Sequence, residues 1–281
     1  TPNEPEIKKD VNGKPEETLA NREDSFTYHV NTSVPVDATA FEVHDSLVDV
    51  LSFVGQASAS LNGEALDAKQ IKVDGQTITL TFDAKIREGA NLSGYFKDDK
   101  IQVPNKATYR IGFPNRPGVT KDSNEVPVTP PSPEEPGIKK KVNGKAAATL
   151  ETREEEFTYT VETKVPYDAT AFEVTDTLVD VLTFSGDKGQ AQASLDGKDL
   201  DAKQITVDGQ TIKVTLTEDQ VKANGGKAVT LSFQAKIREN ANLSAYVTKD
   251  NKTEIPNKAT YRVDLPNKPG VTKDSNEVPV T

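Results

Sequence analysis

The sequence predicts an all-β protein that contains two tandem β-sandwich domains. An internal repeat is the first observation, since residues 38–51 return almost unchanged as residues 169–182. Within each copy, short segments of alternating apolar and polar residues are separated by turn-forming residues, a pattern typical of sandwich strands. A proline-rich stretch lies between the copies and favours a semi-rigid spacer. We therefore predict a first domain at 1–129, a linker at 130–136 and a second domain at 137–281.

Three segments of the first domain alternate as strands do. They are residues 26–30, 41–47 and 77–86, and in the last of these the even-numbered apolar residues from 78 to 86 share one face. Residues 73–78 include an Asp-Gly pair and are interpreted as a turn that leads into the third strand.

The second domain departs from the first after its copy of this turn. Thr217-Glu-Asp-Gln220 has the capping-box pattern of a helix start, and the strand pattern resumes only after Gly225-Gly226. We expect a short extra helix and an extra strand here, where the first domain has one continuous strand. A tolerated difference in a surface connection is the favoured explanation.

Composition excludes several classes of function. The chain has 34 Lys and Arg against 44 Asp and Glu, a net charge of -10, with the two signs interspersed. This surface argues against nucleic-acid and anionic-membrane partners. Cysteine is absent, so disulfides, thiol nucleophiles and thiolate metal sites are excluded. No apolar run is long enough to cross a bilayer, and no secretion signal or anchoring tail is visible, so we expect a fragment or a mature interior piece.

Each domain places three polar residues on the apolar face of three different strands. Side chains alternate across a strand, so a polar residue two positions from apolar ones shares their face. The inward lysines, aspartic acids and asparagines are Lys9, Asp45 and Asn105 in the first domain and Lys140, Asp176 and Asn257 in the second. Apolar residues would suit a core better, so these six positions are the candidate site.

These three residue types can form an amide bond without a cofactor. Burial lowers the pKa of a lysine, which makes part of the amine neutral, and raises the pKa of an aspartic acid, which keeps it protonated. The protonated acid can donate to the asparagine amide oxygen and polarise its carbonyl. The amine then attacks, the acid moves protons, ammonia leaves, and the folded core holds the groups in place.

The motifs resemble a known family. Lysine in the first strand, aspartic acid in F-x-V-x-D-x-L and asparagine in N-x-A-x-Y are similar to the intramolecular isopeptide domains of Gram-positive surface proteins, specifically the collagen-adhesin A-type immunoglobulin-like module. Similar modules build pilin backbones and the stalks of aggregation-substance-type adhesins anchored to the cell wall. The resemblance covers nearly the whole chain. It implies two bonds, Lys9 to Asn105 assisted by Asp45 and Lys140 to Asn257 assisted by Asp176.

Other assignments of these residues remain open. Lys9 could extend its amine to solvent from an edge strand, Asp45 could cap a turn, and Asn105 could satisfy backbone groups. Asn124 and Asn276 are alternative acceptors, because they share parity with the valines that follow them. Lys8 and Lys139 are rival donors, which strand parity disfavours.

The sequence therefore predicts a structural stalk segment of a bacterial adhesin, extracellular and attached to a Gram-positive cell wall. Expected partners are adjacent domains of the same protein, with host or bacterial surface proteins reached through the parent adhesin; the segment is expected to be a monomer that contacts no membrane. The alternative function is a ligand-binding module, for which Tyr95 and Phe96 are a weak candidate. No enzyme acting on external substrates is predicted, since His29 and His44 have outward parity. No cofactor or metal is expected, and calcium at residues 10–12 is disfavoured because Lys141 replaces Asp10 in the second copy.

Overall fold

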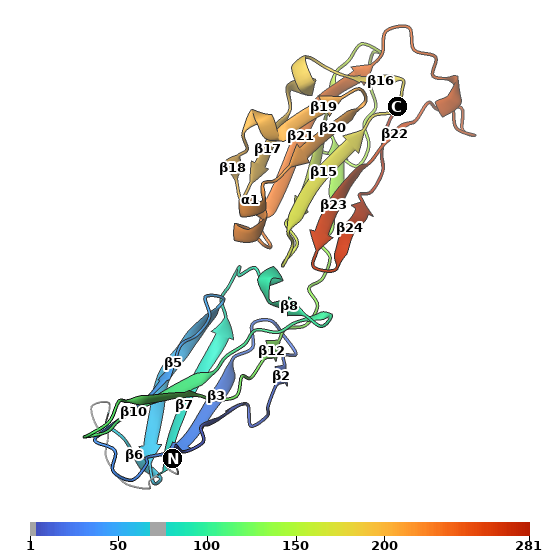
Figure 1. The fold of residues 1–281 in the computed structure, drawn as a ribbon. Coiled ribbons are helices and arrows are strands. Elements are labelled where there is room, and N and C mark those ends of the chain that lie inside the picture. Colours follow the sequence, from blue (N-terminus) through green and yellow to red (C-terminus); the bar gives the residue numbers. More distant parts are fainter. Residues whose placement is uncertain (1–3, 68–76) are drawn as a thin grey trace. The chain divides into compact units, whose positions relative to one another are not determined.

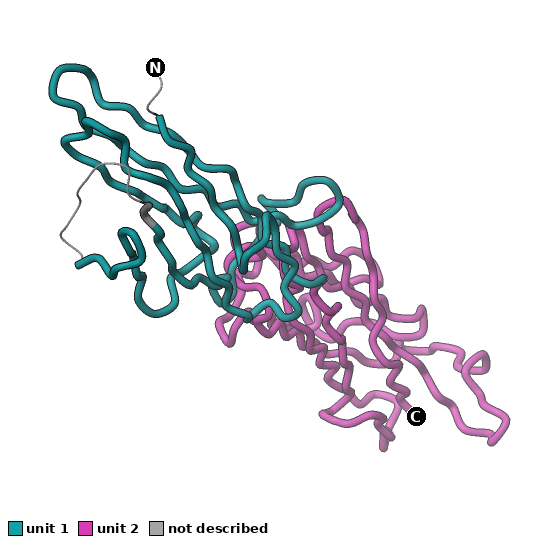
Figure 2. The backbone as a smooth tube through the Cα atoms, turned by 90° about the horizontal axis from the view of Figure 1, so that it is seen from below, with its two compact units in different colours: residues 1–132 teal, residues 133–281 magenta. Residues whose placement is uncertain are grey.

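The computed structural model describes residues 4–67 and 77–281, and nearly all of the regular structure in them is β-strand (Figure 1). The chain divides into two compact units, Thr1–Ser132 and Pro133–Thr281 (Figure 2). The division falls inside the proline-rich segment of residues 130–136. The predicted all-β fold is confirmed, and each unit is a sandwich with its own core.

Domain 1 consists mainly of two antiparallel sheets. The first has the strand order β1-β3-β7-β5-β6, with β1 Lys8–Val11, β3 Phe26–Ser33, β7 Thr77–Ile86, β5 Leu51–Leu61 and β6 Glu64–Ala65. The second has the order β11-β10-β4, with β4 Ala40–Asp45, β10 Ala107–Gly112 and β11 Val119–Asp122. The predicted strand at 41–47 thus begins one residue earlier and ends at Asp45, and residues 73–76 of the predicted turn lie outside the described residues.

Short pieces complete this domain. They are the parallel pair β2 Glu17–Thr18 and β12 Val128–Thr129, the pair β8 Phe96–Lys97 and β9 Lys100–Ile101, and a 3-10 turn at Ser93–Tyr95. The predicted strand that carries Asn105 is therefore interrupted, since β9 ends at Ile101 and β10 begins at Ala107.

Domain 2 repeats this arrangement, with more strands in its sheets than the described residues of domain 1 contribute. Its first sheet has the order β13-β14-β21-β17-β18, with β16 also paired to β21: β13 Lys139–Val142, β14 Phe157–Lys164, β21 Ala228–Ile237, β17 Gln192–Leu195, β18 Lys198–Asp199 and β16 Leu182–Phe184. The second has the order β19-β20-β15-β23-β24: β19 Ile205–Asp208, β20 Thr211–Thr215, β15 Ala171–Thr177, β23 Ala259–Leu265 and β24 Lys268–Asp274. A separate pair joins β22 Ile255–Asn257 to β25 Val278–Val280. Single 3-10 turns lie at Asp187–Gln190, Ala202–Gln204 and Ser244–Tyr246.

The insertion in domain 2 forms the predicted helix α1, Glu218–Ala223. Thr217 caps it, because its side chain accepts from the Gln220 N–H at 3.1 Å while the Gln220 side chain accepts from the Thr217 N–H at 2.9 Å. The strand β20 ahead of it belongs to one sheet and β21 after it to the other. Among the described residues of domain 1 no α-helix is present. The prediction of an extra helix and strand in the second copy is confirmed.

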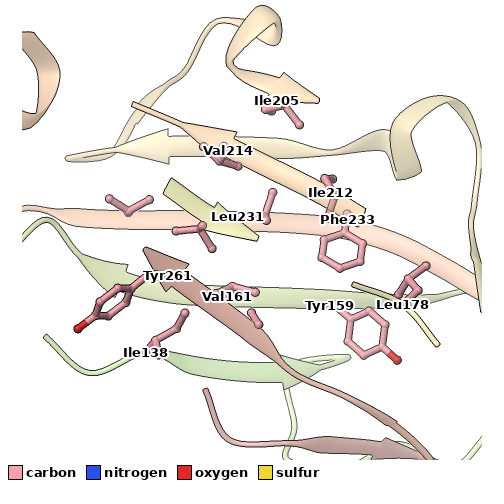
Figure 3. Close-up of a cluster of buried hydrophobic side chains, with 14 of the residues drawn as sticks. Ile138, Tyr159, Val161, Leu178, Ile205, Ile212, Val214, Leu231, Phe233 and Tyr261 are labelled. Atoms are coloured by element: carbon pink, nitrogen blue, oxygen red, sulfur yellow. The ribbon is translucent and has the colours of Figure 1, made fainter. Parts of the chain in front are cut away.

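The buried apolar residues described in domain 1 fall into two groups that both contact Leu80. One group includes Ile7 and Ala107 and the other includes Val11 and Val103. Lys9 lies between Ile7 and Val11 in sequence, and Asn105 lies between Val103 and Ala107. Lys9 and Asn105 are thus flanked in sequence by buried apolar residues on both sides. In domain 2 the corresponding apolar residues belong to one continuous group (Figure 3).

A tyrosine fixes the chain just ahead of the first strand in each domain. The Tyr109 hydroxyl donates to the Pro5 carbonyl at 2.6 Å, and the Tyr261 hydroxyl donates to the Pro136 carbonyl at 2.8 Å. Both tyrosine rings are fully buried, so the hydroxyl at the tip holds the incoming chain against the sandwich. The entry of each domain into its first strand is fixed by this contact.

Candidate functional site

The inward lysine of each domain lies in the middle of its first strand. Lys9 pairs with Val30 across β1 and β3, and Lys140 pairs with Val161 across β13 and β14. Their side chains are completely shielded from solvent, with 0% exposed in each. Long amphipathic side chains usually bring their amine to water. Neither lysine does so here, which excludes the interpretation that the amine extends from an edge strand to solvent.

An aspartic acid from the opposite sheet meets each lysine. The Lys9 amine forms a short ion pair with the Asp45 carboxyl, and the Lys140 amine forms one with Asp176. The carboxyl side chains are 3% and 0% exposed. Asp45 ends β4 opposite Ala107, whereas Asp176 lies within β15 with a neighbour on each side, Ala259 and Ile212. The pairing of donor and acid expected from the sequence is present in both domains.

Burial changes the pKa values of the pair in opposite directions. Desolvation lowers the pKa of Lys9 and of Lys140 below that of a free lysine, although the neighbouring carboxylate opposes the change. Desolvation also raises the pKa of Asp45, and it raises the pKa of Asp176 to about 6, against the opposing effect of the lysine. Both changes favour the neutral pair, an amine and a carboxylic acid, over the ion pair.

The asparagine of each domain is buried beside this pair without a regular hydrogen bond. Asn105 and Asn257 are 3% and 4% exposed. Within the described chain, neither the amide nitrogen nor the amide oxygen of either residue has a hydrogen-bond partner. Each amide is close enough to its aspartic acid to lower the pKa of that carboxyl, without meeting hydrogen-bond geometry. Leaving such groups unpaired costs about 1 to 3 kcal/mol each, so hydrogen bonding does not explain why an asparagine is buried at this position.

Two aromatic rings enclose the lysine amine. The Lys9 Nζ lies 4.1 Å from the centre of the Tyr28 ring and 4.9 Å from that of Phe82. In domain 2 the corresponding distances from Lys140 are 4.1 Å to Tyr159 and 5.1 Å to Phe233. Figure 3 shows Tyr159 and Phe233 side by side between the strands of this core, with ring centres 5.5 Å apart.

This enclosure was not predicted. The rings exclude water and stabilise the ammonium form through their faces. The inward parity of Tyr28 was the available signal; in the neighbouring strand it lies opposite Val11, one inward position along from Lys9. Strand pairing was needed to use it.

The rival residues have other positions. Lys8 is exposed, with 77% of its side chain accessible, and Lys139 is exposed as well. Asn124 and Asn276 were expected to point inward, but both are exposed, and Ser123 is the buried residue. The strand β11 ends at Asp122 and residues 123–127 are irregular, so strand parity does not continue across these positions. Their side chains instead hydrogen bond to the backbone of the lysines.

The remaining polar candidates belong to local structure. The His29 ring pairs with Asp10 at 2.7 Å, and His44 pairs with Glu42 at 3.0 Å. The Tyr95 hydroxyl donates to Asp49 at 3.0 Å. In residues 4–67 and 77–281, no group of three or more His, Cys, Asp or Glu side chains is arranged to hold a metal ion. None of the helices in these ranges is both apolar and long enough to cross a membrane.

Comparison with known proteins gives one extensive match. The chain is 60% identical over 301 aligned residues to platelet adherence protein A of Streptococcus gordonii, and all of the chain is covered. The chain resembles part of a streptococcal adhesin. It spans only 8% of the length of that relative. The resemblance to Gram-positive surface adhesins predicted from the sequence is confirmed by this match.

No family model matches the chain. Among solved structures, the major pilin subunit BcpA of Bacillus cereus is 16% identical, with a TM-score of 0.46 over 99% of this chain and 69% of that one. The collagen-binding subdomain of the Enterococcus faecalis surface protein ACE is 10% identical, with a TM-score of 0.34 over 53% of this chain and 98% of that one.

Proposed function

We propose that the chain is a structural stalk segment of a bacterial surface adhesin, and that each domain forms one intramolecular amide bond. The bonds join Lys9 to Asn105 and Lys140 to Asn257, with Asp45 and Asp176 assisting. One observation carries the proposal: in both domains a fully buried lysine and aspartic acid accompany a buried asparagine amide that has no regular hydrogen bond.

The reaction needs only these groups. A proton moves from the lysine ammonium to the aspartate within the ion pair, which gives the neutral amine and the carboxylic acid. The acid hydrogen bonds to the asparagine carbonyl oxygen, the lysine Nζ attacks Cγ, and a tetrahedral intermediate forms. The Cγ–Nδ2 bond then breaks, the acid supplies the proton that the leaving nitrogen needs, and the proton on the attacking nitrogen returns to the carboxylate. One ammonia molecule leaves and one amide bond remains, so the acid is regenerated.

Exclusion of water from the core favours this reaction. Polarisation of a carbonyl by a neutral acid is stronger where water is excluded, and both ionic side chains are 3% exposed or less. The aromatic rings lie 4.1 to 5.1 Å from the amine and help to hold it in place. The chemistry is directed at the protein itself, so no external substrate is implied.

The proposed bond changes how a domain carries tension. Force applied at the N-terminal end enters the first strand and passes through the amide to the segment that holds the asparagine. The strands between these points in sequence are bypassed. A module of this kind suits a cell-wall-attached, extracellular stalk, which is consistent with the match to part of a streptococcal adherence protein. Its partners are neighbouring domains of the same protein.

The mass of the denatured protein tests the proposal. The parent is expected to be lighter than its sequence by two ammonia molecules, and Asp45→Ala and Asp176→Ala variants by one each. Tryptic peptides that link Lys9 to Asn105 and Lys140 to Asn257 would identify the bonds. A parent with the unmodified mass would show that the buried groups are a polar network only.

One observation favours a second function, a binding module in domain 1. Phe53 is 59% exposed, whereas its counterpart Phe184 in domain 2 is partly buried, and the Gly189 turn lies against it. The matched relative is a platelet adherence protein, so platelets are the surface to test. Saturable binding of the two-domain protein to platelets that is lost in Phe53→Ser would support this function over the stalk. Binding that is absent or unchanged in Phe53→Ser would count against it.

A further inference from the structure

The exposed asparagines Asn124 and Asn276 hold the backbone of the buried lysines. The Lys9 N–H donates to the Asn124 Oδ1 at 2.8 Å, and the Asn124 Nδ2 donates to the Lys9 carbonyl at 2.9 Å. Asn276 makes the same two hydrogen bonds to Lys140, at 2.8 and 2.9 Å. A strand residue offers this pair of groups to its neighbour, so the side-chain amide acts as a one-residue strand on the open edge of β1 or β13.

The segment that carries Asn124 is also bound to the backbone around Asn105. The Val126 N–H donates to the Asn105 carbonyl at 2.8 Å. Next to it, the Ser123 N–H donates to the Ala107 carbonyl at 2.7 Å, and the Ser123 hydroxyl accepts from the Ala107 N–H at 2.8 Å. Residues 123–126 therefore hydrogen bond to the backbone of both reacting residues, to Lys9 through the Asn124 side chain and to Asn105 through the Val126 N–H.

Domain 2 has the same connection. Ser275 exchanges hydrogen bonds with Ala259, at 2.8 Å from its N–H and 2.9 Å to its hydroxyl, and Val278 pairs with Asn257. Residues 275–278 thus reproduce the contacts of residues 123–126. The arrangement is common to both copies.

We infer that Asn124 and Asn276 are positioning residues for amide-bond formation, a role that rests on the proposed function. The lysine belongs to one sheet, and the asparagine it would attack precedes a strand of the other. Apolar packing alone lets the edges of two sheets shift, whereas the two amide hydrogen bonds fix the lysine backbone against the segment that also holds the acceptor. Reaction between held groups is sensitive to misplacements of about 1 Å, which can cost about a hundredfold in rate.

The edge position of β1 and β13 distinguishes a positioning role of the two asparagines from simple hydrogen bonding of the strand backbone. Water can satisfy the N–H and carbonyl of an exposed edge strand, so β1 and β13 need no side chain for that purpose. The asparagine pays side-chain entropy to replace water. What it adds is a fixed distance between the lysine strand and the acceptor segment. Loss of Asn276 should therefore slow the reaction more than it destabilises the fold.

Time-resolved crosslinking of the whole two-domain chain tests the inference. A pulse of cell-free synthesis is chased, samples are denatured at intervals, and linked and unlinked tryptic peptides are quantified by mass. Asn276→Ala is compared with Thr163→Val as the matched control. Thr163 also donates a side-chain hydrogen bond to the segment ahead of β13, to the Gly137 carbonyl at 2.8 Å, whereas Lys140 is paired with Val161. The rate of link formation in domain 1 of the same chain serves as the internal reference.

Asn276→Ala is expected to form the Lys140–Asn257 link at least about tenfold more slowly than the parent, while the domain 1 link forms at the parent rate. Thr163→Val is expected to form the same link within about twofold of the parent rate. The cooperative unfolding of both variants is measured in parallel to compare their stabilities. If Asn276→Ala does not fold, Asn124→Ala against Thr32→Val repeats the test in domain 1, where Thr32 donates to the Glu6 carbonyl at 2.9 Å.

The outcomes separate this inference from the function beneath it. A parent without either link overturns the proposed function itself. A parent with both links, together with an unchanged rate in a folded Asn276→Ala, overturns the positioning role alone. Equal slowing in Asn276→Ala and Thr163→Val would also overturn it, because general loosening of the domain would then explain the effect.

Discussion

If the proposed Lys140–Asn257 bond forms, a variant of domain 2 without it should be considerably less stable than the parent. The informative variant replaces Lys140 by Met and Asp176 by Leu together. Removing only one of the pair would leave a buried unpaired charge, which costs about 3 to 5 kcal/mol by itself. Replacing both with apolar side chains of similar size is close to neutral, so the change that remains is the loss of the bond.

The size of the effect follows from the loop that the bond closes. The stretch from Lys140 to Asn257 encloses roughly 120 residues, for which the loss of denatured-state entropy gives about 5 kcal/mol. For a unit of about 150 residues, each kcal/mol changes the melting temperature by about 2 to 4 °C. The double variant should therefore melt about 10 to 20 °C below the parent. The corresponding change in domain 1 encloses a shorter loop and should have a slightly smaller effect.

Calorimetry of the two-domain chain, with intact masses measured on the same samples, can separate the transition of domain 2 from that of domain 1. The unchanged domain is the control, and its transition should not move. A parent that has lost two ammonia molecules, beside a variant whose domain 2 melts within about 3 °C of it, would refute the entropic reasoning. In that case the bond would form without constraining the denatured chain.

Three further outcomes are expected. The rate of link formation in domain 2 should fall as the pH drops below about 6, because the raised pKa of Asp176 leaves both the acid and the ammonium protonated there. Above that pH the rate should be constant until the lysine–aspartic acid pair loses its shared proton. A rate that keeps rising with pH would contradict the pairing. Asp45→Ala should abolish only the domain 1 link, as read from linked peptides, and loss of both links would show that the domains do not react independently. Thr217→Ala should destabilise domain 2 by about 1 kcal/mol through loss of the helix cap, measured by denaturant unfolding. Thr248→Ala is the control, because that half-buried threonine accepts one backbone hydrogen bond outside any helix.

Strand parity was sufficient to find the buried lysine and acid. Lys9 shares a face with Ile7 and Val11, and Asp176 shares one with Phe172 and Val174, so a two-residue period places each side chain in the core. The repeat strengthened this prediction, because both copies place the same residue types on the same faces. The fold class followed from the same alternation.

Parity failed where the chain leaves a strand. Asn124 was expected inward with Val126 and Val128, but β11 ends at Asp122, Asn124 is exposed and Ser123 is buried. Its contact with Lys9 joins residues 115 positions apart, and no local pattern indicates which edge strand lies next to which segment. The pairing of Tyr28 with the lysine amine was missed for the same reason, since it depends on sheet order.

The place of Asn257 in the chain determines what can still lengthen under load. With a bond at Lys140, a pull from both ends would bypass residues 141–256 and reach the hairpin β23–β24 and the terminal strand β25, which follow the acceptor. That tail contains roughly 24 residues and could release about 80 Å if it peeled away. Each module would then be inextensible up to the acceptor asparagine and extensible only in the segment after it. The β22–β25 pairing would set the force at which that segment unfolds.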